Sequence, residues 1–193
     1  DLFADNADNY LIELSRHIDT DRGNREVNMW MQCVPCVERI GDYATDILEF
    51  AEDMRKDGIT FSAGAQRELA IMCSAVEEIV DLTVKAVESG DLSIAERVEP
   101  LEETIDDMTA LLKDRHIERL KEGKCVVSAG LAFVETLTSL ERAADQCSSI
   151  ALLLLARENQ EIMANHHQYL RELHKGAKGG YTEELNRRHD QYM

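Results

Sequence analysis

The sequence is poor in the residues that build β-sheets and in those that interrupt helices. Aromatic residues make up 5% of its 193 residues, and there are two prolines. Alanine, leucine, glutamate, isoleucine and methionine fill long stretches instead, and these residues favour α-helices. No segment shows the alternation of apolar and polar residues that is typical of a half-buried strand. Because 44% of the residues are hydrophobic, the chain can bury a core, and we predict an all-α fold.

Positive charge is scarce as well. The chain carries 21 lysines and arginines against 38 aspartates and glutamates, which gives a formal net charge of −17. Such a charge repels phosphate backbones and anionic lipid surfaces, so we expect no nucleic-acid partner. It suits either cation binding or a solvated acidic surface.

Long apolar runs are missing too. The longest, residues 150–156, is far shorter than the ~20 residues that a transmembrane helix needs. The chain opens without a signal-peptide pattern. Its first residue is Asp1 rather than methionine, so we expect a fragment or a processed form.

The five cysteines do not form the framework of a secreted protein. Their number is odd and the chain is not small, which fits a reducing compartment better than a disulfide scaffold. Cys33 and Cys36 form a CxxC motif, but no strand precedes it and no second copy follows. We interpret the motif as two helix thiols beside Pro35. The remaining three cysteines lie on apolar stripes and are expected in the core.

Apolar residues that recur every three or four positions predict a series of helices. Ser62 and Asp91 are expected to cap two of them, and Gly58 and Gly123 to end two others. Pro100 should bend or break the helix that contains it. The predicted ranges are residues 2–18, 25–56, 63–88, 92–121, 124–157 and 159–175, with a short helix or frayed tail over 182–192.

One acidic block occurs twice. Residues 37–44 read VERIGDYA, and residues 140–147 read LERAADQC. A second pair of segments, residues 8–18 and 106–117, is also parallel, with one residue inserted. The first two predicted helices therefore match the fourth and fifth, whereas the third has no counterpart. We predict two three-helix units followed by a tail, with the first unit N-terminally incomplete. The expected boundaries are 1–58, 59–158 and 159–193.

The repeated blocks carry carboxylates four residues apart. This spacing places both carboxylates on one helix face, roughly 5–6 Å apart at Cβ. Acids from neighbouring helices could converge into one cluster per unit and bind a hard cation. The alternative is a solvated helix face, which the pattern alone slightly favours. The chain has no Glu-x-x-His motif, no Walker loop and no GxSxG motif, which counts against a metal-dependent enzyme. The pairs concerned are Glu38/Asp42, Glu102/Asp106 and Glu141/Asp145.

The block Glu38-Arg39-Ile40-Gly41-Asp42 resembles the signature of PhoU domains, which are helical regulators of phosphate uptake. Further blocks are similar to the cytoplasmic PhoU-like region that follows the membrane domain of bacterial sodium/phosphate cotransporters. These blocks are residues 68–70, 75–79, 98–106, 115–120, 140–145 and 169–174. The resemblance covers nearly the whole chain. It implies a PhoU-like antiparallel helical bundle of two pseudo-repeated three-helix units.

The resemblance also implies metal clusters, which in the family are multinuclear and hold iron or zinc in some members; manganese and magnesium are further candidates. Glu38 and Asp42 correspond to the first cluster, together with Asp8. Ala4 occupies a ligand position there and cannot bind a metal, so the first site is expected to be weaker unless Asp5 substitutes. The second cluster corresponds to Glu102, Asp106, Glu141 and Asp145.

On this resemblance we expect a non-enzymatic regulatory or accessory domain on the cytoplasmic side of the cell membrane. Its partner would be the membrane domain of a sodium-dependent phosphate cotransporter, preceding Asp1 in the same polypeptide; a homodimer is left open. The alternative is a free-standing soluble regulator that acts on an ABC-type transporter or a sensor kinase. A metal-dependent enzyme on a helical bundle is the less favoured third hypothesis.

Overall fold

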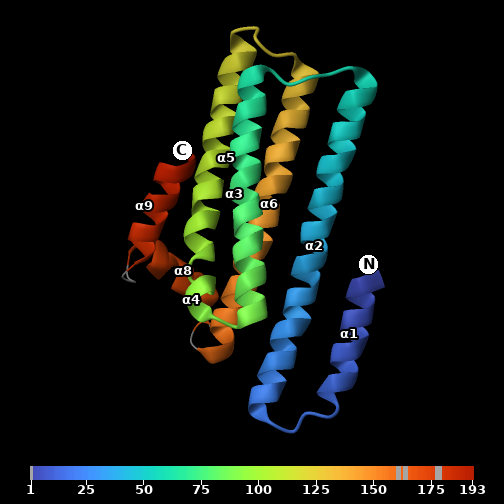
Figure 1. The fold of residues 1–193 in the computed structure, drawn as a ribbon, viewed down its shortest axis with the longest axis vertical. Coiled ribbons are helices and arrows are strands. Elements are labelled where there is room, and N and C mark those ends of the chain that lie inside the picture. Colours follow the sequence, from blue (N-terminus) through green and yellow to red (C-terminus); the bar gives the residue numbers. More distant parts are fainter. Residues whose placement is uncertain (1, 160–161, 163–164, 177–179) are drawn as a thin grey trace.

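The computed structural model describes residues 2–159, 162, 165–176 and 180–193. All regular structure in these residues is helical, which confirms the predicted all-α class. Four long helices run antiparallel to one another (Figure 1). The helices are α1 (Leu2–Ser15), α2 (Asp21–Asp57), α3 (Ala63–Ser89), α4 (Leu92–Ala95), α5 (Val98–Lys121), α6 (Val127–Glu158), α8 (His166–His174) and α9 (Tyr181–Tyr192).

Local side-chain chemistry sets several helix ends. The Ser62 hydroxyl accepts a hydrogen bond from the backbone N–H of Ala65, and the Asp91 carboxylate accepts one from the N–H of Ser93, as the sequence predicts. Gly58 ends α2 with a φ of 65°, a left-handed conformation that glycine adopts without strain. Thr20 caps α2 by accepting from the N–H of Gly23, so this helix starts four residues before the predicted position.

The two prolines behave differently because they occupy different positions in their helices. Pro35 lies inside α2, and the helix continues through it. Pro100 lies in the first turn of α5, where its missing N–H costs little. The predicted helix over residues 92–121 is divided into α4 and α5 by Glu96 and Arg97. The predicted break is therefore confirmed.

Helix α6 is at the centre of the bundle. It packs on α2, α3 and α5, and the fully buried side chains Leu137 and Cys147 lie on it. Helices α5 and α6 form an antiparallel hairpin on which α3 packs. Helices α1 and α2 form a second hairpin at the edge of the molecule (Figure 1).

The cysteines are free thiols. Cys33 and Cys36 lie within α2 as predicted, and burial raises the pKa of Cys33 to about 12, so this thiol is unreactive. Cys147 is fully buried in the core, as the sequence predicts. Cys73 on α3 and Cys125 in the loop between α5 and α6 are only partly buried, so these two are not the core residues that the sequence predicts.

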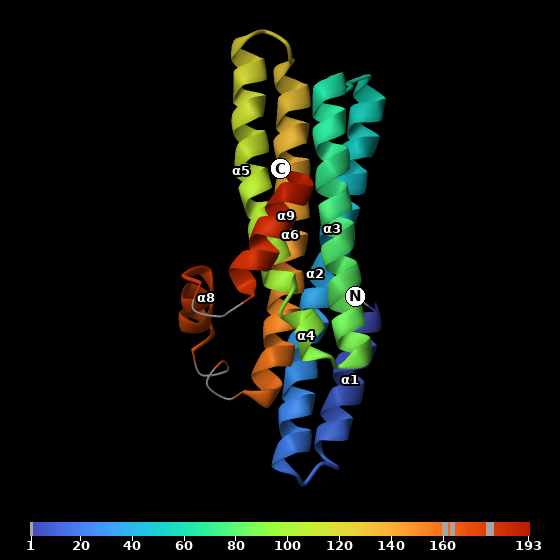
Figure 2. The ribbon, with the colours of Figure 1, turned by 60° about the vertical axis from the view of Figure 1, so that its left-hand side comes forward.

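The C-terminal segment lies on the outside of the bundle. Figure 2 shows α9 running alongside α5, and α9 also contacts α3. The last predicted helix is therefore an ordered, docked helix and not a frayed tail. The helix predicted over residues 159–175 is described as α8, and four of its positions, 160, 161, 163 and 164, lie outside the described residues. None of the described helices is long and apolar enough to cross a membrane.

Candidate functional site

The first turns of α5 carry five acids. Glu99, Glu102, Glu103, Asp106 and Asp107 follow one another at helical spacings. Residues three and four positions apart lie on the same side of a helix, so Glu99, Glu102 and Asp106 share a face. This face is directed toward Asp145 of α6, because the two helices pack as an antiparallel hairpin.

Glu102 and Asp145 form the centre of this carboxylate cluster. The neighbouring carboxyl of Asp145 favours the protonated form of Glu102 through a hydrogen bond and through its negative charge. Burial raises the pKa of Glu102 to about 9, and the negative charges of Glu99, Asp145 and Asp106 contribute to the same shift. Glu102 therefore holds a proton at neutral pH. Asp106 and Asp145, two further acids that the sequence predicts for the second site, are close enough for their charges to act on Glu102.

The fourth predicted acid, Glu141, is engaged elsewhere. Its Oε2 lies 3.3 Å from Nζ of Lys113 on α5, and both side chains are about one-quarter to one-third exposed. Lys113 thus neutralises Glu141 one helical turn from Asp145.

Glu99 belongs to the cluster although the sequence analysis did not select it. Its carboxylate is almost fully buried and accepts a hydrogen bond from the hydroxyl of Ser148 on α6. The Nε2 atom of His174 lies 2.9 Å from Glu99 Oε1, and its Nδ1 atom lies 3.6 Å from Glu103 Oε2. These partners satisfy Glu99 and bring the C-terminal segment against the acidic face.

The acids of the first unit lie on a different surface. Glu38 and Asp42 line a groove of about 750 Å³ between α1 and α2, together with Ala4. Asp8 is exposed on α1 and does not line this groove. Asp8 thus lies outside the groove that the other two predicted ligands line.

The carboxylate oxygens of the second cluster are the type of donor that hard cations prefer. In the part of the chain that the structure describes, no three side chains of the usual ligand types are gathered closely enough to hold an ion as they stand. A cation between Glu102 and Asp145 would have to recruit a third carboxylate. Asp106, whose charge also acts on Glu102, is a candidate.

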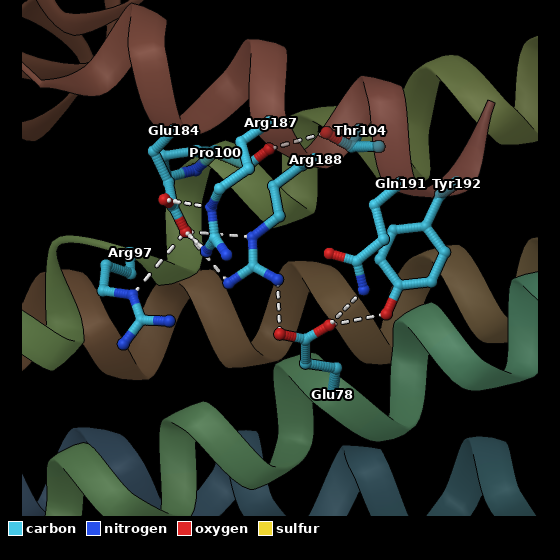
Figure 3. A network of polar contacts seen from close by, with 9 residues as sticks. All are labelled: Glu78, Arg97, Pro100, Thr104, Glu184, Arg187, Arg188, Gln191 and Tyr192. Carbon is cyan, nitrogen blue, oxygen red and sulfur yellow. Dashed lines mark hydrogen bonds and ion pairs between the residues drawn. The ribbon is translucent and has the colours of Figure 1, made fainter.

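A buried arginine anchors α9 over this region (Figure 3). The guanidinium of Arg188 has no exposed surface and lies between Glu78 of α3 and Glu184 of α9, whose Oε1 is 3.0 Å from Nη2. Tyr192 donates to Glu78 Oε2 at 2.5 Å, and Gln191 donates to the same oxygen at 3.2 Å. Burial alone would raise the pKa of Glu78, but the hydrogen bonds from Tyr192 and Arg188 lower it below its usual value. The anchor thus stabilises a charged Glu78.

Helix α9 and His174 of α8 cover part of the acidic face. His189 Nε2 lies 3.1 Å from Asp107 Oδ2. The ring of Tyr181 is buried and stacks on His174 at 5.8 Å between centroids. Burial raises the pKa of Tyr181, and the charges of Glu103 and Glu99 add to this effect. The hydroxyl of Tyr181 has no hydrogen-bond partner among the described residues.

This helical segment has known counterparts. Residues 69–154 match the PhoU domain family. The match extends from α3 through most of α6 and so includes both helices that carry the carboxylate cluster. The fold is accordingly an all-α PhoU-like bundle.

A curated relative is the phosphate-specific transport system accessory protein PhoU homolog 1 of Thermotoga maritima. It is 25% identical over 143 residues, which are 74% of this chain and 60% of the relative. The chain therefore spans about 60% of the length of the curated relative it matches. No solved structure matches the chain.

The functional residues that sequence reasoning missed are those of the tail contact. Arg188 was assigned to a polar tail, yet Tyr181, Glu184, Arg188 and Tyr192 recur at three- and four-residue intervals. That spacing is the signal of a helix with one packed face. Glu99 carried no such signal, because its burial depends on Ser148 and His174, which are distant in sequence.

Proposed function

We propose that this chain is a regulatory or accessory domain in phosphate transport, acting by binding and docking and not by catalysis. The observation that carries the proposal is the PhoU family match, which coincides with the helices that carry the carboxylate cluster. The name of the Thermotoga maritima relative describes an accessory protein of phosphate transport. Assigning the same role to this chain is part of the proposal.

We place the domain on the cytoplasmic side of a sodium-dependent phosphate cotransporter, with the transporter's membrane domain as its partner. Support comes from the ordered sequence blocks on α3, α5 and α8 that resemble the PhoU-like region of such cotransporters. The free-standing alternative, a regulator of a phosphate-specific transport system or its sensor kinase, is favoured by the name of the relative.

We propose further that the second cluster binds a cation, with iron, zinc, manganese and magnesium as candidates. Glu102 and Asp145 would hold it, with Asp106 as the third oxygen donor. A bound cation supplies the positive charge that lets these carboxyls ionise together at neutral pH. Glu99 is held by Ser148 and His174, and Glu141 by Lys113, so these acids would orient the face and not bind the ion.

Elemental analysis of protein purified without chelators tests the cation proposal. We expect metal in the unmodified chain and its loss in a Glu102→Ala/Asp145→Ala variant. Glu77→Ala/Asp81→Ala is the matched control, because it removes one exposed glutamate and one exposed aspartate from α3, away from the cluster, and should keep the metal. Metal-free unmodified protein, or equal loss in both variants, would contradict the proposed site.

Uptake measurements separate the two transport contexts. Cells that express a sodium/phosphate cotransporter with and without this domain are compared for sodium-dependent phosphate uptake. A change in uptake that requires sodium supports the cotransporter context. If sodium-dependent uptake is unchanged while expression of the isolated chain alters sodium-independent uptake, the free-standing regulator is supported. No effect in either assay would contradict the regulatory role itself.

A further inference from the structure

A cavity lies where the C-terminal segment meets the long helices. Its volume is about 220 Å³, and residues of α4, α5, α6, α8 and α9 line it together. Figure 2 shows α8 and the start of α9 on the side of the bundle where α5 begins. Because α8 and α9 supply part of its wall, the cavity is complete only while the C-terminal segment is docked. It shares no residue with the groove that Glu38 and Asp42 line.

Most of the cavity wall is apolar. Helix α6 contributes Ala151, Leu152 and Leu155, and α8 contributes Tyr169 and Leu173. Ala151, Leu155 and Leu173 are buried. Such a surface favours the hydrocarbon part of a ligand, because contact between the two removes apolar surface from water on both sides.

One acidic side chain is built into the wall. Glu99 lines the cavity and is 6% exposed. Ser148, which also lines the cavity, donates a hydrogen bond to one of its oxygens, and Nε2 of His174 lies 2.9 Å from the other. A carboxylate has about four lone-pair positions, so Glu99 retains the capacity to accept hydrogen bonds from a ligand.

Tyr181 supplies a second polar atom. Its side chain is 6% exposed, and its hydroxyl has no hydrogen-bond partner among the described residues. Burial and the charges of Glu103 and Glu99 raise the pKa of Tyr181, so the hydroxyl lies near the carboxylate that lines the cavity. A buried hydroxyl without a partner is unfavourable, which favours a ligand atom that forms a hydrogen bond with it.

The charges around the cavity favour a cation over an anion. Glu96 and Glu99 line the cavity, and Arg97 is the single cation among the described residues that line it. The Nε atom of Arg97 lies 3.6 Å from Oε1 of Glu184, and the Arg97 side chain is 45% exposed. Its charge is therefore offset by Glu184 and screened by solvent. A ligand with a positive charge is attracted by the two glutamates, whereas an anion is repelled.

We propose that this cavity binds a small aliphatic amine in its ammonium form. The ammonium group donates hydrogen bonds to the Glu99 carboxylate and to the hydroxyl oxygen of Tyr181. The hydrocarbon chain packs on Ala151 and Leu155 of α6. An aliphatic amine has a pKa of about 10.4, as the lysine side chain does, so it is charged at neutral pH. This assignment does not depend on the phosphate-transport role or on the proposed metal site.

Isothermal titration calorimetry of the full chain with n-butylammonium chloride tests the proposal. A chelator is present throughout, so that bound metal ions do not contribute. n-Butanol and sodium butyrate are titrated in the same way, because they keep a short hydrocarbon chain and replace the ammonium group by a neutral hydroxyl or by a carboxylate. We expect n-butylammonium to bind saturably and at least roughly tenfold more tightly than either of them, since hydrogen bonds to charged groups are the stronger ones.

Two variants locate the site. Glu99→Gln removes the negative charge with little change in shape and should weaken n-butylammonium binding by at least roughly tenfold. Tyr181→Phe keeps the ring and should weaken binding about two- to tenfold. Because the Tyr181 hydroxyl has no partner among the described residues, this change should not lower the unfolding temperature, and it decides the test if Glu99→Gln fails to fold. Glu183→Gln is the matched control, because Glu183 is an exposed carboxylate of α9 that does not line the cavity.

Binding should also slow hydrogen exchange of residues 181–192, because the ligand binds only the docked form of the C-terminal segment. The absence of saturable n-butylammonium binding would overturn the proposal. Butyrate or n-butanol binding as tightly as n-butylammonium would overturn it as well, since the charge of the ligand would then not be recognised. The same conclusion would follow if Tyr181→Phe left binding unchanged, or if Glu99→Gln and Glu183→Gln weakened it equally.

Discussion

Replacing Arg188 with alanine tests whether α9 is held on the bundle by its buried guanidinium. The change removes the positive charge shared by Glu78 and Glu184 and leaves both carboxylates without their buried partner. Removing one member of a buried ion pair costs about 3–5 kcal/mol, because the remaining charge keeps its desolvation penalty. We expect this loss to appear first in the docking of α9.

The global stability should fall by less than this local cost. Helix α9 packs on the outside of α5 and α3, so it can detach before the long helices separate. The assay is therefore hydrogen exchange of the α9 amides, read beside urea unfolding of the whole chain. A local loss of about 3 kcal/mol corresponds to a roughly 100-fold faster exchange of residues 181–192.

Arg187→Ala is the matched control. Arg187 is the neighbouring arginine and also binds Glu184, but its side chain is 53% exposed and does not reach Glu78. Exposed ion pairs contribute about 0–1 kcal/mol, so exchange of α9 should change by less than roughly tenfold. Equal acceleration in the two variants would refute the assignment of Arg188 as the anchor.

The same anchor predicts a dependence on pH. The pKa of Glu78 is lowered in the folded chain relative to its ordinary value, despite the opposing effect of burial. The stability that Glu78 contributes is therefore complete above the ordinary carboxyl pKa and is lost as the pH falls through the lowered value. In Arg188→Ala, protection of α9 should decline less between neutral and acidic pH than in the unmodified chain.

The remaining predictions concern the carboxylate cluster and two glycines within helices. The folded chain raises the pKa of Glu102 to about 9. The stability that protonated Glu102 contributes is therefore fully present below the ordinary carboxyl pKa and is lost as the pH rises from there to about 9. Glu102→Gln should therefore stabilise metal-free protein at pH 8 by about 1–3 kcal/mol in urea unfolding, with little effect at pH 5; an equal pH dependence in both proteins would contradict the raised pKa. Gly41→Ala should raise the unfolding temperature, since a Cβ there meets nothing within 4 Å and alanine favours a helix by ~0.5–1 kcal/mol. Gly130→Ala should lower the unfolding temperature, since the new Cβ would lie 2.4 Å from Nε2 of the buried His116. If both variants shift the unfolding temperature in the same direction, packing does not distinguish the two glycines.

Several features of this protein follow from residues that are close in sequence. The helix starts at Ser62 and Asp91 and the helix end at Gly58 depend on hydrogen bonds and backbone angles within a few residues. The apolar periodicity determines which face of each helix is buried, and the repeat indicates that the helices bearing Glu102 and Asp145 are related to the first hairpin.

The tertiary structure decided which of the acids act together. Burial and the neighbouring charges of Glu99 and Asp145 raise the pKa of Glu102, whereas Glu141, only four residues from Asp145 in sequence, is paired with Lys113. A pattern of spacing cannot distinguish these outcomes, because a pKa depends on burial and on every charge nearby in space.

The docking of α9 also depends on contacts that only the tertiary structure creates. The C-terminal sequence is polar, and local propensity leaves it as a short helix or a frayed tail. Its partner Glu78 lies 110 residues from Arg188 in the chain and meets it only when α3 and α9 pack together. Sequence alone therefore determined the helices and their apolar faces, whereas the charged contacts that join distant helices existed only once the bundle had formed.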